Sequence, residues 1–361
     1  MAEKKFRRIG VLTSGGDASG MNCAVRAVTR AALASGAEVM GIFKGYSGLI
    51  KNELKLMNER DVSNILNIGG TKLYSDRCDE FKYIEGQRKA AETCRKNNID
   101  GIVAIGGDGT FRGARDLTKQ GIPCIGIPAT IDNDITSTDY SIGFDTSLNT
   151  VIEMVDRLRD TCESHARCNV VEIMGRGAGY LALYAGMAVG ATAVILAEKN
   201  YDEDKLIEKM LTSKKNDKRN FIILVSENMP NGFSENLVKV IEERTKAADS
   251  FIETKFARLA HVQRGGVPTC RDRVIPTMMG KKAVELLYEG KSNLVVCYRN
   301  DIITHMDIDF ALELDRMYKG KMTAEERAAI SAEDIKKMEE ICAVKRAHFD
   351  MMYEINETVS I

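Results

Sequence analysis

Short, continuously apolar segments alternate with longer amphipathic segments along most of this chain. Strands are predicted at 8–13, 38–43, 101–105, 122–127, 169–173, 193–196, 221–225 and 294–298, with helices such as 21–34, 82–97 and 146–163 between them. Strands that alternate with helices are typical of βαβ units and a mostly parallel sheet. Because the predicted strands are apolar throughout, both faces of the sheet are expected to be buried. The predicted fold class is therefore α/β.

Length and charge limit the possible organisation and partners. With 361 residues, the chain is expected to form about two domains. Lys plus Arg is 51 and Asp plus Glu is 52, so the formal net charge of -1 gives no reason to expect nucleic acid or an anionic membrane as partner. The first eight residues are charged and the apolar run after them is too short for a signal sequence, so we expect no targeting segment. No stretch approaches the roughly 20 apolar residues of a membrane span.

The cysteines and histidines indicate the compartment. Nine cysteines are scattered without a C-x-x-C pair, which favours reduced thiols in a cytoplasm over disulfides or a zinc site. Four widely separated histidines argue against a histidine-rich metal cluster.

After Gly320, residues 324–354 are highly charged with helical periodicity and predict a helical extension.

Two glycine-rich turns follow predicted strands, at 14–20 and 106–110. Glycine allows positive φ and lets a phosphate approach backbone N–H groups, and the helix that follows presents its N-terminus to an anion. The second turn adds Asp108, which could hold Mg²⁺ beside a polyphosphate or simply cap the helix. Neither turn matches the Walker pattern or the dinucleotide fingerprint. Together they predict a phosphate site at the carboxyl ends of the strands.

A third loop, 128–134, carries Asp132 and Asp134 two residues apart. In an extended loop these side chains point the same way. One carboxylate could serve a metal while the other takes a proton from a sugar hydroxyl. The alternative is an Asx-rich turn without chemistry.

Six motifs in this order resemble the phosphofructokinase family in its bacterial, ATP-dependent form. They are Gly10 to Arg26, Gly69-Gly70-Thr71 with Arg77, Gly106 to Thr110, Pro128 to Asp134, Met174-Gly175-Arg176 and His261 to Gly266, and the resemblance runs from about residue 8 to about 321. It implies transfer of the γ-phosphoryl group of ATP to the 1-hydroxyl of fructose 6-phosphate. A pyrophosphate-dependent enzyme or a kinase for another ketose phosphate is the alternative. An NAD or lipid kinase would explain only 106–110, and a non-catalytic nucleotide sensor should have lost these carboxylates.

The resemblance also implies a role for each matching residue. The catalytic residues are Asp132 as general base, Gly16, Thr130 and Arg176. ATP is bound by Gly16, Arg77, Cys78, Gly107, Asp108, Gly109 and Thr110, and Mg²⁺ by Asp108 and, through water, Asp134. The sugar phosphate is bound by Thr130, Asp132, Arg167, Met174, Gly175, Arg176, Glu227, Lys255, His261 and Arg264.

The architecture implied is two similar Rossmann-like domains, each a mostly parallel sheet sandwiched by helices. The ATP-binding domain would comprise 1–142 and 263–313, and the sugar-phosphate domain 143–262 and 314–361, including the helical extension. In the family, the residues that match Arg167 and Lys255 reach the 6-phosphate from a neighbouring subunit. A cytoplasmic homotetramer is therefore implied.

Several positions depart from the family pattern or decide between its branches. Lys255 stands where many members have arginine, which predicts a weaker grip on the sugar phosphate. Ser19 replaces a common proline and Ala260 a frequent glycine, and we expect neither to abolish activity. Gly109 and Ala129 are the ATP-type residues, where pyrophosphate-dependent relatives carry Asp and Lys.

The resemblance leaves effector control open. Arg26, Arg30, Arg159 and Lys218 match an intersubunit site for ADP or phosphoenolpyruvate. Against this, Glu59 falls where an arginine is common, although Arg60 lies beside it. Thr192 replaces a common glutamate, and Asn216 and Asn220 replace basic groups. A reversed charge removes a phosphate contact and adds repulsion.

Overall fold

The chain folds into two units, each built from three segments. The computed structural model describes residues 6–360. Unit 1 comprises Met1–Thr130, Ile135–Thr146 and Arg264–Ala343, and unit 2 comprises Ile131–Asp134, Ser147–Gln263 and Val344–Ile361. Residues 314–343 thus group with unit 1, whereas the sequence placed them with the sugar-phosphate domain. The targeting-segment prediction rests partly on residues 1–5, which lie outside the described residues.

The sheet of unit 1 has the strand order β11-β10-β5-β4-β1-β2-β3. Its strands are β1 (Arg8–Ser14), β2 (Glu38–Ile42), β3 (Leu54–Met57), β4 (Gly101–Gly106), β5 (Cys124–Pro128), β10 (Leu294–Arg299) and β11 (Ile302–Asp307). Neighbours from β2 to β10 are parallel, and only the edge strands β3 and β11 pair antiparallel. Strands β4 and β5 are buried along their whole length, as their continuous apolar character predicts.

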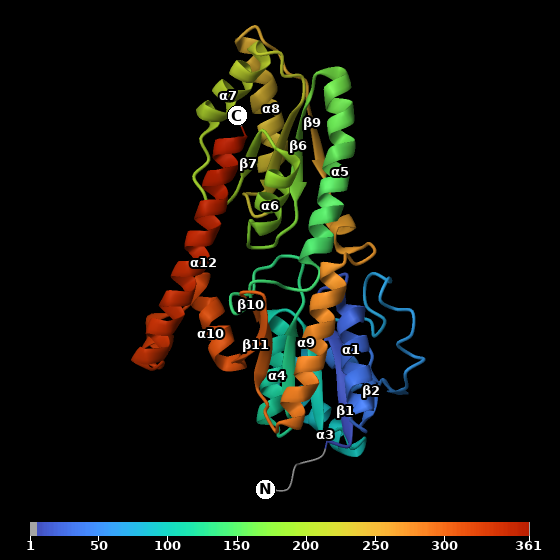
Figure 1. The fold of residues 1–361 in the computed structure, drawn as a ribbon. Helices are drawn as coiled ribbons and strands as arrows, with labels where there is room; N and C mark the ends of the chain where they lie inside the picture. Colours follow the sequence, from blue (N-terminus) through green and yellow to red (C-terminus); the bar gives the residue numbers. More distant parts are fainter. Residues whose placement is uncertain (1–5, 361) are drawn as a thin grey trace. The chain divides into compact units, whose positions relative to one another are not determined.

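Helices cover both faces of this sheet (Figure 1). The helices of unit 1 are α1 (Met21–Ala34), α2 (Gly45–Ile50), α3 (Ile84–Lys96), α4 (Asp108–Lys119), α9 (Arg271–Tyr288), α10 (Ile308–Tyr318), the short α11 (Ala324–Ala328) and the 3-10 turn η1 (Glu80–Lys82). A close approach joins α1 and α9: a Cβ at Gly280 would lie 2.7 Å from the Cβ of Ala27.

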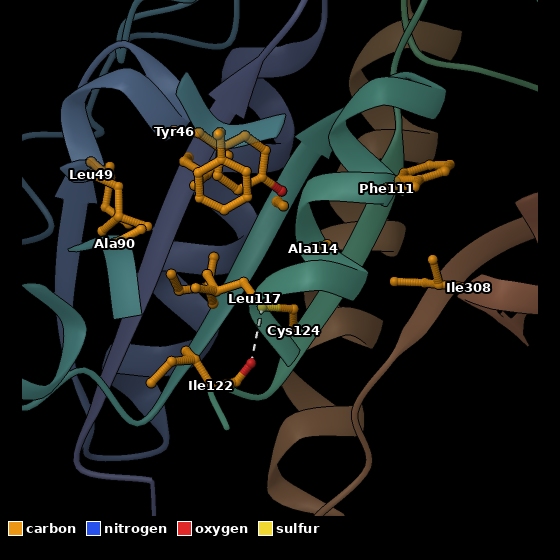
Figure 2. Close-up of a cluster of buried hydrophobic side chains, with 14 of the residues drawn as sticks. Tyr46, Leu49, Ala90, Phe111, Ala114, Leu117, Ile122, Cys124 and Ile308 are labelled. Carbon is orange, nitrogen blue, oxygen red and sulfur yellow. Dashed lines mark hydrogen bonds between the residues drawn. The ribbon is translucent and has the colours of Figure 1, made fainter. Parts of the chain in front are cut away.

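The opposite face carries a buried hydrophobic cluster (Figure 2). Tyr46 and Leu49 come from α2, and Phe111 and Leu117 come from α4. The Tyr46 ring stacks on Phe81 at 4.3 Å, and its hydroxyl donates to the carbonyl of Thr110 at 2.7 Å. The first turn of α4, which overlaps the second glycine-rich turn, is therefore tied to the core.

Unit 2 contains a smaller sheet, in which all three strand pairings are parallel. Its order is β7-β8-β6-β9, with β6 (Cys168–Ile173), β7 (Ala193–Ile195), β8 (Phe221–Ser226) and β9 (Thr254–Arg258). Helices α6 (Tyr180–Val189), α7 (Glu203–Lys215) and α8 (Phe233–Ala247) belong to this unit. Helix α5 (Phe144–His165) enters it, and the 3-10 turn η2 (Ala260–Arg264) leaves it. The predicted fold class is confirmed: α/β with mostly parallel sheets flanked by helices.

The predicted C-terminal helical extension is present as α12 (Ala332–Val359). In unit 1 its residues Met338 and Cys342 pack with Leu314. In unit 2 Phe349 lies edge-on to Tyr180, with ring centroids 5.0 Å apart, and Asp350 pairs with Lys199 at 2.7 Å. Among the described residues, no helix is both long enough and apolar enough to cross a bilayer.

Candidate functional site

The two glycine-rich turns lie side by side in unit 1. Strands β1 and β4 are parallel neighbours, and their last residues, Ser14 and Gly106, are in register. The hydroxyl of Thr110 donates to the carbonyl of Ser14 at 3.1 Å. A Cβ at Gly106 would lie 2.3 Å from that same oxygen, so only glycine fits there. Strands β2 and β3 are added on one side of β1, and β4 and β5 on the other, so the strand order reverses between β1 and β4, which is where open α/β sheets bind ligands.

The segment that leads to Arg77 and Cys78 packs against the first turn. Thr13 donates to the carbonyl of Tyr74 at 2.7 Å, and its hydroxyl also lies 2.7 Å from that of Thr71. Ser75 donates to the carbonyl of Gly15. The chain therefore brings the predicted nucleotide residues of both regions to the same edge of the sheet, with Arg77 exposed and Cys78 half-buried.

Asp108 is the first residue of α4, and its half-buried carboxylate has local partners. One oxygen accepts from the N–H of Gly109 at 2.8 Å, and the other pairs with Arg112 at 3.2 Å. A Cβ at Gly107 or Gly109 would meet no atom within 4 Å. The space around this turn is therefore open.

The described residues hold no group of three or more His, Cys, Asp or Glu side chains suited to a metal ion. Mg²⁺ commonly binds through one or two carboxylates and the phosphates of its substrate. The single partly exposed carboxylate of Asp108 beside a phosphate-type turn fits that mode of binding.

The third loop continues from β5, next to the second turn. The N–H of Ala129 donates to the carbonyl of Gly106 at 2.9 Å, and the carbonyl of Thr130 accepts from Ser141 at 2.7 Å. The following residues, Ile131–Asp134, belong to unit 2. Asp132 is only 3% exposed, whereas Asp134 is half-buried.

Arg264, predicted as a sugar-phosphate ligand, lies in unit 1 beside the first glycine-rich turn. Its Nη1 donates to the carbonyl of Asp17 at 3.3 Å. A Cβ at Gly16 would lie 2.7 Å from that nitrogen. The guanidinium therefore rests directly on the backbone of the turn, a contact that any side chain at position 16 would displace.

In unit 2, Glu227 organises the predicted Met174–Arg176 segment. Its Oε1 accepts from the N–H of Gly175 at 3.1 Å and from that of Arg176 at 2.6 Å. Arg176 has φ 56°, in the left-handed region, and these bonds help to hold that conformation. The Arg176 side chain is exposed, as is that of His261.

Sequence reasoning gave no role to Gln263, which fixes the same segment. Its side chain is 1% exposed, and Oε1 accepts from the N–H of Met174 at 2.9 Å. The available signal was its place inside the H-x-Q-R motif, between His261 and Arg264.

Arg167 and Lys255 converge on one carboxylate that the sequence analysis also missed. Glu253 lies 2.5 Å from Nε of Arg167 and 2.9 Å from Nζ of Lys255. The hydrogen bonds from Lys255 and Arg167 lower the pKa of Glu253 to about 2. Glu253 and Lys255 are two residues apart at the start of an edge strand, a spacing that places both side chains on one face.

The residues matched to an effector site fall in both units. In unit 2, Arg159 donates to Asn220 at 2.9 Å and to the carbonyl of Val189. Burial and the neighbouring Arg159 charge lower the pKa of Lys218. Thr192 is buried, and its hydroxyl accepts from the N–H of Ile222 at 3.3 Å. The remaining matched positions in unit 1 are Arg26, Arg30, Glu59 and Arg60, and Asn216 ends α7.

Comparison with known proteins gives consistent matches. The family profile described as Phosphofructokinase matches residues 8–287. The ATP-dependent 6-phosphofructokinase of Clostridium botulinum is 50% identical over 313 residues, 87% of this chain and 96% of that protein. ATP-dependent 6-phosphofructokinase 1 of Clostridium perfringens has the same identity and coverage.

Solved structures agree on the fold. The phosphofructokinase of Pichia pastoris in the T-state has a TM-score of 0.85 at 32% identity, covering 98% of this chain and 39% of that one. This chain thus spans less than half the length of the Pichia chain. A pyrophosphate-dependent phosphofructokinase from Marinobacter aquaeolei has a TM-score of 0.71 at 21% identity, covering 84% of this chain and 83% of that one, and supports the fold alone.

Proposed function

The chain belongs to the phosphofructokinase family, and we propose that it transfers the γ-phosphoryl group of ATP to the 1-hydroxyl of D-fructose 6-phosphate. The products are fructose 1,6-bisphosphate and ADP, in the committed step of glycolysis. The observation that carries this proposal is the pairing of two glycine-rich turns at the ends of β1 and β4 in a chain half identical to ATP-dependent enzymes.

Phosphoryl transfer requires positioning, charge neutralisation and a base. In the proposed mechanism, Asp132 takes the proton of the 1-hydroxyl as the oxygen attacks phosphorus. Its burial limits competition from water. The N–H of Gly16 holds the transferring group, Thr130 contacts both sugar and phosphate, and Arg176 neutralises charge. Asp108 and Asp134 would hold Mg²⁺, which supplies electrostatic stabilisation of the phosphates when bound.

Selection of ATP is proposed to rest on Gly109, with Ala129 as the second ATP-type position. The open space beside Gly109 leaves room for the α-phosphate and nucleoside. An aspartate there would project its charge toward that phosphate. Arg77, Cys78, Gly107 and Thr110 complete the proposed nucleotide side.

In the proposed sugar-phosphate site, Arg167 and Lys255 would contact the 6-phosphate of a sugar bound to the neighbouring subunit. Their ion pairs with Glu253 would then be replaced by contacts with phosphate oxygens. Met174, Gly175, Glu227, His261 and Arg264 would complete the site. Such sharing requires at least two subunits, and the proposed assembly is a homotetramer in the cytoplasm.

Exposed apolar side chains in unit 1 support such an assembly. Val267, Val274 and Met278 are 63%, 52% and 43% exposed, and the last two are one helical turn apart on α9. Val274 and Met278, close together on one helix, offer apolar surface to another subunit.

A coupled assay of the purified protein tests the proposed function. We expect turnover with Mg-ATP and fructose 6-phosphate, and none with pyrophosphate. Comparable rates with pyrophosphate, or a higher kcat/KM for tagatose or sedoheptulose phosphate, would reassign the substrate. The same assay tests the proposed effector response: a sigmoidal sugar-phosphate curve relieved by ADP supports it, and ADP-independent kinetics contradicts it.

A further inference from the structure

Ser19 joins two segments of unit 1 that are almost 250 positions apart in sequence. Its side chain is 1% exposed. The hydroxyl donates to the carbonyl of Gly266 at 2.9 Å and lies 3.5 Å from the carbonyl of Arg264. The second distance is at the outer limit of a hydrogen bond, so Gly266 is the principal acceptor.

The loop that receives this hydrogen bond carries Arg264. The Arg264 side chain itself contacts the first glycine-rich turn, through Nη1 and the carbonyl of Asp17 at 3.3 Å. The loop is therefore attached to the turn twice, by the Arg264 side chain and by the Ser19 hydroxyl. When a phosphate binds the Arg264 guanidinium, the contact with Asp17 would be lost, whereas the hydrogen bond from Ser19 to Gly266 would remain.

A third segment packs on the same carbonyl. A Cβ at Gly69 would lie 2.4 Å from the oxygen of Gly266, so the 68–70 loop touches it directly. Asn22, on α1, holds that loop: its amide donates to Ile68 at 2.9 Å and its Oδ1 accepts from the N–H of Lys72 at 2.7 Å. Gly266 itself is exposed, but its carbonyl accepts a hydrogen bond from Ser19 and lies against the 68–70 loop.

We propose that Ser19 is a positioning residue, which fixes the loop carrying Arg264 against the glycine-rich turn and thereby sets the affinity for the phosphorylated sugar. The inference rests on the proposed function for its substrate, but the loop contact itself does not. Ser19 stands where the family commonly has proline, whose side chain has no hydroxyl to donate. The loop is therefore held here by a contact that such relatives lack.

Kinetics of Ser19→Ala test this role. We expect the KM for fructose 6-phosphate to rise roughly two- to tenfold, the range expected for one lost hydrogen bond, while kcat and the KM for ATP change less than twofold. Ser19→Thr keeps the hydroxyl and should restore the wild-type KM. The control is Thr29→Val, which removes a buried hydroxyl on α1 that donates to the carbonyl of Val25 at 2.8 Å.

A second readout does not depend on activity. Trypsin cleaves after arginine, so a released loop should be cut faster at Arg264 in Ser19→Ala than in the wild type or Thr29→Val. An unchanged KM together with an unchanged cleavage rate overturns the proposal. Equal shifts in both variants would show only a general loss of stability and would also overturn it. If the wild type has no turnover but Ser19→Ala is still cut faster, the proposed function fails while the loop contact stands.

Discussion

Among single residues, Asp132 is the one on which the proposed chemistry depends most directly. Asp132→Asn replaces the base with an amide that cannot accept the hydroxyl proton, so kcat should fall on the order of 100-fold or more. Steady-state kinetics measures this, with both KM values expected to stay within a few-fold. Asp301→Asn, at an exposed turn, is the control and should behave as wild type. A kcat for Asp132→Asn within tenfold of wild type would assign the base elsewhere.

Substitution of Gly109 can test how ATP is selected, because a side chain at this position would not clash with the folded structure. Its Cβ would point into open space and its φ is not in the left-handed region, so a side chain is tolerated. We expect Gly109→Asp to raise the KM for ATP about tenfold or more, through repulsion of the α-phosphate. Gly109→Asn has nearly the same volume but no charge and should raise it much less. Equal effects of the two would mean that volume, rather than charge, excludes the nucleotide.

Glu253 gives a pH dependence of stability with a defined sign. Its pKa is lowered to about 2 in the folded chain, below the ordinary value near 4.5. A lowered pKa stabilises the folded state above the unfolded value, and that stabilisation is lost as pH falls through the folded value. The Tm of wild type should therefore exceed that of Glu253→Gln at neutral pH, and the difference should shrink between about pH 5 and pH 2.

Salt provides the control for this measurement. The ion pairs of Glu253 are solvent-accessible, so high ionic strength should reduce the Tm difference at neutral pH. A difference that stays constant over the whole pH range would show that Glu253 acts by packing rather than by charge.

Moving from residues to elements, α12 depends on a small number of buried contacts. Phe349 is 6% exposed and lies edge-on to Tyr180. Phe349→Ala should lower the free energy of unfolding by about 3–5 kcal/mol, measured by urea denaturation. Val344→Ala, at a position 71% exposed on the same helix, should change it by less than about 0.5 kcal/mol. Similar values for both variants would mean that this part of α12 contributes little to stability.

The elements most accurately predicted from the sequence have a strong local pattern, an apolar run for β1 and helical periodicity for α1 and α5. Strand β1 and helix α1 were predicted to within one residue, and α5 to within two at each end. The edge strands β3, β9 and β11 were missed. Their side chains are largely half-buried or exposed, so they lack the continuous apolar signal that marks a central strand.

The parts of the candidate site that could be predicted are those formed by residues close together in the sequence. Glycine-rich turns and the D-x-D spacing can be read within a few residues of each other. The contact of Glu253 with Arg167 and that of Gln263 with Met174 depend on segments that meet only in the folded chain. The assigned site roles themselves stay predictions until the variants are measured.

At the scale of the whole molecule, subunit mixing can test the proposal that two subunits share each sugar-phosphate site. The Asp132→Asn variant retains the cationic side chains of Arg167 and Lys255. The double variant Arg167→Ala/Lys255→Ala retains Asp132 as the base. Each alone should be nearly inactive. Co-expressed in equal amounts, they should recover about a quarter of wild-type activity, because a site formed between two subunits is intact when each supplies its unaltered half. No recovery would mean that each subunit provides its own cations.

The interleaving of the two units has a consequence for how such a protein can diversify. The chain alternates between them in six segments. Every breakpoint therefore divides at least one unit, so a single recombination event cannot exchange one unit between relatives and leave the other whole. A single crossover instead exchanges part of a unit, so the packing inside that unit must accommodate residues from two parents.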